Sequence, residues 1–423
     1  EKNKIKMLTK LKKFILDHHR KYNQDDQNPP SLQIQTLFAL ESGIRTALLC
    51  GALKLSVGQL LSFVKKRRLI GFNRSQLQDT AQLSLFLGTF SFSSKMIHAL
   101  LNHHHHGERT HHAFVAGLLG GVFGMLWDKD VERRKSIAVY MFVQAACMIL
   151  SDLVQRDVIP KFKHADVLLF CTAIAPIMHA YVADPDALPK SYGRFIVNIG
   201  PIDQHALDVA RDLIYDKPYS QIAMRKLSDK FGVCMPSTPL KRVDCTLFHP
   251  GQHSCSRVVL KVFIQSLLRS YVYYFPLLIP KLVRALINKN RKDLVKWFIQ
   301  LSRMSAFLST FIGSYQFWSC LEANLRPTQS SGYFTYGVVG FLAAMSLIIA
   351  PKYQRYDIAT WIAPRGLQTL WHFWKKQGGW PGFVKGEIAL FSVSAATLYT
   401  YWHHQPSLLP KMFQSVMSFL ITK

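Results

Sequence analysis

A compact run of cysteine and histidine residues lies just past the middle of the 423-residue chain, at Cys245, His249, His253 and Cys255. Thiolate sulfur and imidazole nitrogen are common zinc ligands in proteins, and four of them complete a structural site. The spacing fits no standard zinc finger, so a disulfide between the two cysteines and a pair of free thiols remain open alternatives. Apart from such a structural zinc ion, the sequence predicts no cofactor.

Familiar catalytic motifs do not occur in the sequence: there is no P-loop, GxGxxG, GxSxG, HExxH or CxxC. Two acids at comparable places, Asp166 and Glu387, each follow a Pro-x-Phe turn at the start of an apolar segment. Helix capping and the helix dipole explain an acid there. We therefore predict that the protein is not an enzyme, and no residue is assigned a catalytic or cofactor-binding role.

The Cys/His segment is positioned by a chain that is unusually apolar, and its charges occur in short runs. Hydrophobic residues make up 49% of the chain and charged residues 18%, against about one-quarter charged residues in soluble domains. The net charge of +27 is carried by short basic runs beside apolar stretches, such as 65–68. Such runs attract anionic lipid head groups. We expect membrane lipids, further copies of the chain or other membrane proteins as partners, and no nucleic acid.

The apolar stretches are long enough to predict an all-α, polytopic membrane protein. A basic segment (1–36) precedes a first membrane region (37–190), and a polar linker with the Cys/His loop (191–256) leads to a second (257–423). Short helices are expected in the linker at Asp203–Tyr215 and Tyr219–Phe231. The apolar segments cover 43–64, 80–101, 113–127, 136–153, 167–183, 257–284, 303–322, 333–350, 357–375 and 387–404.

The second membrane region repeats the first. Phe86-Leu-Gly-Thr-Phe90 matches Phe307-Leu-Ser-Thr-Phe311 at an offset of 221 residues, and Pro160 and Phe162 match Pro381 and Phe383 at the same offset. Shared proline, glycine, charge and spacing indicate two related repeats. Each repeat is predicted to hold four or five transmembrane helices. Five would invert the second repeat relative to the first, as in many transporters, and four would keep the two parallel.

Glycines spaced four apart mark one segment of the first repeat. These are Gly117, Gly120, Gly121 and Gly124, and Gly337 and Gly340 correspond in the second repeat. Small residues at this spacing share a helix face and allow another helix backbone to come close. We predict that these glycines serve helix packing.

The segments described above resemble the transmembrane protein 135 family. The likeness rests on Cys245–Cys255, on the aromatic-proline stretch Tyr271–Pro276 that follows, on Phe86–Phe90 with the glycine-rich segment, and on Pro160–Asp166. The membrane core is also distantly similar to glycine-rich subunits of mitochondrial inner-membrane protein translocases.

This resemblance implies a non-enzymatic membrane protein of mitochondria or peroxisomes, or of both, involved in organelle dynamics and lipid homeostasis. The alternative is a transporter or translocase-like channel with a path at the repeat interface. Charged residues facing that interface would favour transport, whereas charges at the rims would favour a scaffold.

Overall fold

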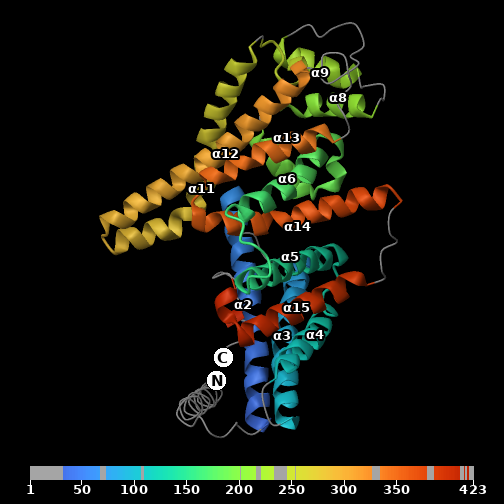
Figure 1. The fold of residues 1–423 in the computed structure, drawn as a ribbon, viewed down its shortest axis with the longest axis vertical. Helices are drawn as coiled ribbons and strands as arrows, with labels where there is room; N and C mark the ends of the chain where they lie inside the picture. Colours follow the sequence, from blue (N-terminus) through green and yellow to red (C-terminus); the bar gives the residue numbers. More distant parts are fainter. Residues whose placement is uncertain are drawn as a thin grey trace. The chain divides into compact units, whose positions relative to one another are not determined.

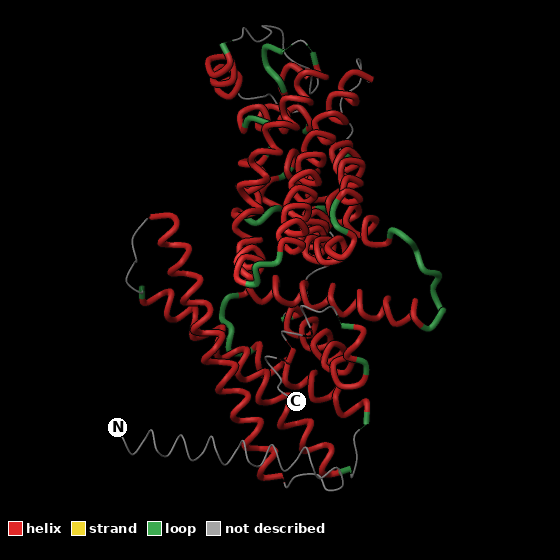
Figure 2. Tube along the Cα trace, turned by 90° about the vertical axis from the view of Figure 1, so that its left-hand side faces the viewer, coloured by secondary structure: helices red, strands yellow, loops and turns green. Residues whose placement is uncertain are grey.

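A computed structural model of the chain describes residues 32–66, 73–105, 109–200, 202–215, 221–232, 245–252, 254–325, 334–378 and 385–409, with 414, 417 and 418. Every regular element within these ranges is a helix (Figure 2). The described part of the chain thus confirms the all-helical fold class. The basic N-terminal helix expected before residue 32 lies outside the described ranges.

The chain forms two compact units, and one of them is discontinuous in sequence (Figure 1). The first unit consists of Glu1–Gln155 together with Val384–Lys423, and the second of Arg156–Phe383. Described elements of the first unit are α2 (Leu32–Lys66), α3 (Arg74–His104), α4 (Thr110–Met125), α5 (Val131–Gln155), α15 (Gly386–His404) and the 3-10 turn η3 (Pro406–Leu408). Those of the second are α6 (Ala165–Ala183), η1 (Pro185–Ala187), α7 (Lys190–Ile199), α8 (Gln204–Ile214), α9 (Gln221–Phe231), α10 (Cys245–Phe248), α11 (Cys255–Ile287), α12 (Arg291–Leu325), α13 (Thr335–Ala344), η2 (Met345–Ile349) and α14 (Lys352–Lys376).

In the first unit, α2 packs along α3, α3 packs on α4, and α15 lies against both α4 and α5. An aromatic contact joins α3 to α15: the ring of Phe391 lies edge-on to Phe86 at 5.4 Å and to Phe90 at 6.1 Å between centroids. The last long helix of the chain therefore completes a core formed by helices that precede it by more than 200 residues.

In the second unit, α11 and α12 form a long hairpin, α12 packs on α13, and α6 lies against both α13 and α14. The ring of Phe170 on α6 lies edge-on to Phe307 at 5.8 Å and to Phe311 at 6.5 Å. Helix α6 is mostly buried, and residues from α8, α10 and α13 join its apolar cluster. The polar middle segment is thus packed onto the helical core of this unit.

Helices long and apolar enough to cross a membrane occur in both units. Four described segments qualify: Leu32–Ser56, Val131–Gln155, Ala165–Ala183 and Cys255–Ile287. All ten apolar segments of the sequence fall on helices, although the third apolar helix of the second half, α13, ends in the 3-10 turn η2. Pro176 lies inside α6, and Pro276 and Pro280 lie inside α11. Such internal prolines are better tolerated in membrane helices than in soluble ones.

The two short helices expected in the middle segment are confirmed as α8 and α9. Helix α8 begins where it does because the Asp203 carboxylate accepts a hydrogen bond from the backbone N–H of His205 at 2.9 Å, which caps its N-terminus. Two further helices, α7 and α10, were not expected from the sequence, because ten and four residues give too short a periodic pattern.

Candidate metal centre

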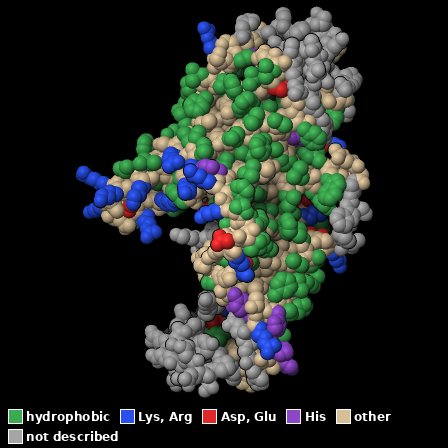
Figure 3. All heavy atoms as spheres, viewed as in Figure 1, with side chains coloured by type: hydrophobic (Ala, Val, Ile, Leu, Met, Phe, Trp, Pro, Cys, Tyr) green, Lys and Arg blue, Asp and Glu red, His purple; other side chains and the backbone are tan. Residues whose placement is uncertain are grey.

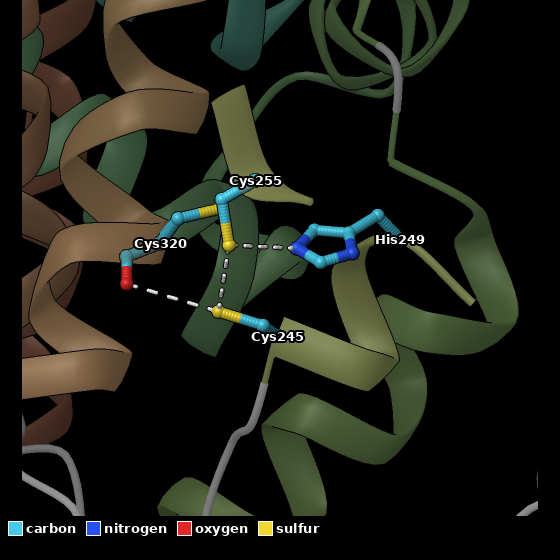
Figure 4. A group of neighbouring side chains, drawn as sticks. All are labelled: Cys245, His249, Cys255 and Cys320. Carbon is cyan, nitrogen blue, oxygen red and sulfur yellow. Dashed lines mark hydrogen bonds between the residues drawn. The ribbon is translucent and has the colours of Figure 1, made fainter. Parts of the chain in front are cut away.

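Three segments of the second unit bring Cys245, His249, Cys255 and Cys320 together (Figure 4). Cys245 opens the short helix α10, and Cys255 is the first residue of α11. The turn between these helices carries His249, and its Gly251 has a left-handed φ of +73°, which glycine adopts without strain. Cys320 comes from α12, which packs against both α10 and α11.

The distances in this cluster resemble those of a four-coordinate metal site. All four ligand atoms lie within 4.8 Å of one another. The Sγ atoms of Cys245 and Cys255 are 3.9 Å apart, and Cys255 Sγ is 3.4 Å from His249 Nε2. Zinc bonds of about 2.3 Å to sulfur and about 2.0 Å to nitrogen give tetrahedral edges of about 3.8 Å and about 3.5 Å. These two distances are therefore close to the edges of a tetrahedral zinc site.

The imidazole of His249 is oriented by its second nitrogen. Its Nδ1 lies 2.9 Å from the carbonyl oxygen of Gln252, and an N–H at that position donates to the carbonyl. In the neutral ring, this hydrogen bond favours the tautomer in which Nε2 presents a lone pair to the sulfur atoms. Histidine ligands of zinc sites usually have such a partner on the other ring nitrogen.

Hydrogen bonding to the cysteines favours a positive charge at this place, although burial opposes it. Cys245, His249 and Cys320 are each less than a tenth exposed, and Cys255 is half-buried. The side chain of Asn324 points an amide N–H at the sulfur atoms of Cys245 and Cys255, each 3.8 Å away. Hydrogen bonding to Cys245 and then Cys255 raises the pKa of His249 to about 9. An imidazolium ion or a metal ion would supply the positive charge that these sulfur atoms stabilise.

The ligand set differs by one residue from that expected from the sequence. Three of the four expected residues, Cys245, His249 and Cys255, lie in the cluster. The fourth, His253, falls outside the described residues, and Cys320 provides the remaining donor. Sequence reasoning missed Cys320 because it lies 65 positions beyond Cys255 in an apolar stretch, where a thiol normally packs as a small hydrophobe.

With a metal ion bound, this ligand set would be that of a structural site. Four protein ligands would close the coordination shell, whereas a catalytic zinc keeps one position for water or substrate. Beside the cluster, a groove of about 530 Å³ runs between α11 and α12, and its lining includes Phe263, Gly313 and Phe317. No acid, histidine or lysine lines this groove, so it offers no general base next to the cluster.

The glycines expected to serve helix packing lie at close helix contacts. A Cβ atom on Gly117 or Gly121 would come within 2.8 Å of the α15 backbone, at Ala396 and Ser392. Gly120 and Gly124 face α3 instead. In the second unit, Gly337 and Gly340 face α6, where a Cβ atom would lie 3.3 Å from the Ala175 oxygen and 2.5 Å from Met178 Cβ.

The two acids at the segment starts make structural contacts. Glu387 accepts a hydrogen bond from Arg134 Nη2 at 2.8 Å, which joins the first turns of α15 and α5. The Asp166 carboxylate accepts from the backbone N–H of Val167 at 2.9 Å, in the first turn of α6. Neither contact brings the acid to the cysteine cluster.

No protein-family model and no solved structure matches the chain. The fold and site therefore define a class only: a helical protein with candidate membrane-spanning helices and a Cys/His cluster whose geometry is compatible with zinc.

Proposed function

We propose that this chain is an integral membrane protein with a structural, non-enzymatic task in mitochondrial or peroxisomal membranes, where it contributes to organelle dynamics and lipid homeostasis. The observation that carries the membrane assignment is the surface of the long helices. Only 22% of the apolar window is buried in Leu32–Ser56 and in Cys255–Ile287. Large contiguous apolar surfaces are rare on soluble monomers, and lipid would cover these. The choice of organelle and of biological role rests on the family resemblance.

Within this proposal, zinc occupies the Cys245–His249–Cys255–Cys320 cluster. The support is the tetrahedral spacing of the donor atoms and the hydrogen bond that orients His249. Zinc bound there would link the end of the polar middle segment to α11 and α12. Metal binding of this kind contributes directly to folding stability.

We also propose that the chain contains two repeats that exchange their last helix. The offset of 221 relates Phe86 to Phe307 and also Phe170 to Phe391. The aromatic contact Phe86–Phe391 in one unit thus has a counterpart, Phe307–Phe170, in the other.

A second pair of contacts supports the exchange. Gly117 lies against Ala396, and Gly337 lies against Ala175, which are matching positions of the two repeats. Each unit would then hold four helices of one repeat and the fifth helix of the other. This arrangement explains why the compact units do not coincide with 37–190 and 257–423.

Ion pairs at helix ends support a scaffold over a transporter. Arg133 pairs with Asp128, Arg134 pairs with Glu387, and Lys376 pairs with Asp184. These residues stand in the first or last turn of a helix or in the loop beside it. No described ion pair lies near the middle of α4, α6, α13 or α15. Charges do lie within α2 and α3, where Lys54 pairs with Asp79 and Lys95 interacts with Arg45 and Glu41.

Two measurements test this function. Alkaline carbonate is expected to leave the protein in the membrane pellet, and its release into the supernatant would contradict the membrane assignment. A tagged chain is expected to co-fractionate with mitochondrial or peroxisomal markers, and its deletion to change the number or shape of that organelle. Residence in another membrane would contradict the organelle assignment.

A further inference from the structure

The end of the α11–α12 hairpin is the most basic described part of the second unit. Figure 3 shows lysine and arginine side chains gathered over this projecting end. One acid, Asp293, lies among them and pairs with Lys296 at 3.7 Å. The basic end of the hairpin consists of Lys281, Arg284, Lys289, Arg291, Lys292 and Lys296, all exposed.

An exposed apolar stripe leads along α11 to this basic end. Its members follow one another at intervals of three or four residues and so lie on one face of the helix. Between Leu260 and Ile279 the stripe is about 29 Å long at 1.5 Å per residue, close to the thickness of the hydrocarbon core. The stripe contains Leu260, Ile264, Leu268, Val272, Phe275, Ile279, Val283 and Leu286, each at least 39% exposed.

Aromatic side chains lie where the stripe meets the charges. The indole N–H of Trp297 donates to the Leu278 carbonyl at 2.9 Å, and its ring lies edge-on to Phe275. Lys281 Nζ stands 6.0 Å from the centre of the Tyr353 ring. Tryptophan, tyrosine and lysine side chains are enriched at the level of lipid head groups, where one end is apolar and the other hydrated.

The turn at the tip holds the charges in one place. Asn290 Oδ1 accepts from the backbone N–H of Lys292 at 3.1 Å, and Asn290 Nδ2 donates to Asp293 at 2.9 Å. Lys289 has a left-handed φ of 49°, a conformation normally left to glycine or asparagine. A lysine there adds a further positive charge at the outermost part of the turn.

We propose that the basic end of the hairpin binds the phosphate groups of anionic phospholipids in the adjoining leaflet. This inference rests on the membrane insertion proposed above. Charge complementarity identifies the ligand, because six basic residues face outward around a single paired acid. The apolar stripe and the aromatic residues place these charges at head-group depth, which a nucleic-acid surface would not require. Each basic residue at a membrane surface strengthens binding to anionic lipid about fivefold.

The test compares two double variants by native mass spectrometry, with phosphatidylglycerol or phosphatidylcholine titrated into the detergent-solubilised full-length protein. The hairpin variant is Arg291→Gln with Lys292→Gln. Its control, Arg225→Gln with Lys226→Gln, removes two exposed charges from α9 in the same unit. We expect the hairpin variant to bind phosphatidylglycerol about 25-fold more weakly, since it lacks two basic residues. Its affinity for phosphatidylcholine should not change, and the control should resemble the wild type.

Unchanged affinity of the hairpin variant for phosphatidylglycerol, or an equal loss in the control, would overturn the proposal. Carbonate extraction of the same proteins separates this failure from that of the membrane assignment. If the wild type stays in the pellet while the hairpin charges prove irrelevant, only the lipid-binding inference fails. If the wild type is released, the membrane assignment fails as well.

Discussion

The two ring nitrogens of His249 make different contacts. Nδ1 is occupied by the Gln252 carbonyl, and Nε2 faces Cys255 Sγ. Because the ring is fixed before any metal arrives, little conformational entropy remains to be lost on binding. The other three donors come from helix ends or from α12, whose packing holds them equally well.

Replacement of Cys320 tests the ligand set. Cys320→Ser removes a sulfur donor from a buried site and should lower the zinc content of the purified protein from about one per chain to a small fraction. Cys171→Ser, at a buried cysteine of α6 outside the cluster, is the matched control and should keep its zinc. Elemental analysis provides the measurement. Full zinc content in Cys320→Ser would show that this thiol is not a ligand.

A pH-dependent prediction concerns Asp203, the N-cap of α8. Burial alone would raise its pKa, but hydrogen bonds from Lys230 and from the His205 backbone hold the pKa below its usual value. Because its pKa is lower in the folded state, the ionised carboxylate stabilises the protein at pH values above the usual pKa of aspartate. That contribution is lost as the pH falls through the lowered value.

At pH 7, Asp203→Asn keeps a capping side chain and loses only the ion pair, so it should cost about 0.5 kcal/mol. Asp203→Ala loses the cap as well and should cost about 1 kcal/mol more. Hydrogen exchange of the α8 amides measures both. The difference between wild type and Asp203→Asn should vanish once the pH has fallen below the lowered pKa of Asp203, and a difference that persists there would refute the assignment.

At the scale of single residues, the sequence predicted those candidate metal ligands that are close together in the chain. Cys245, His249 and Cys255 could be predicted because they occur within eleven residues. Cys320 could not, because it joins them only through the packing of α10 on α12.

At the scale of elements, α4 depends on small residues for its two close contacts. Gly121→Leu would drive a branched side chain into the α15 backbone at Ser392 and should destabilise the first unit by about 1–3 kcal/mol. Gly58→Leu is the control, because a Cβ atom on Gly58 of α2 meets nothing within 4 Å. Thermal unfolding in detergent compares them. Equal unfolding temperatures for the two variants would mean that the α4–α15 contact is not close.

The aromatic contacts predict effects that are confined to one unit. Phe391→Ala should destabilise the first unit by about 3–5 kcal/mol, and Phe170→Ala the second by a similar amount, because both rings are buried in their units. Exchange protection of α3 and α12 amides reports on each unit separately. Phe142→Ala, at a 40% exposed position of α5, should have little effect. If Phe391→Ala lowered the exchange protection of α12 as much as that of α3, then Phe391 would not belong to the core of the first unit alone.

Helix positions were more predictable from the sequence than helix partners. Apolar length predicted a helix at every one of the ten segments, since periodicity and turn residues mark where a helix begins and ends. The offset of 221 residues related helices of one half to helices of the other. It carried no information on whether α6 and α15 pack within their own half, because an apolar pattern does not specify the helix against which it packs.

At the scale of the whole molecule, the two units explain how the two halves of the chain stay associated. The first unit needs α15, and the second needs α6. Neither half of the sequence can then complete its core alone. Once the protein has folded, the two halves should therefore stay associated even when the chain between them is cut.

Cleavage between the halves tests most directly whether each unit is completed by a helix from the other half of the chain. A protease site inserted between residues 233 and 244 allows the purified, folded protein to be cleaved into a fragment with α2–α9 and a fragment with α10–α15. We expect the fragments to stay together through affinity purification and size exclusion in detergent, and to separate only when the protein unfolds. Fragments that part under native conditions and each remain folded would contradict this arrangement.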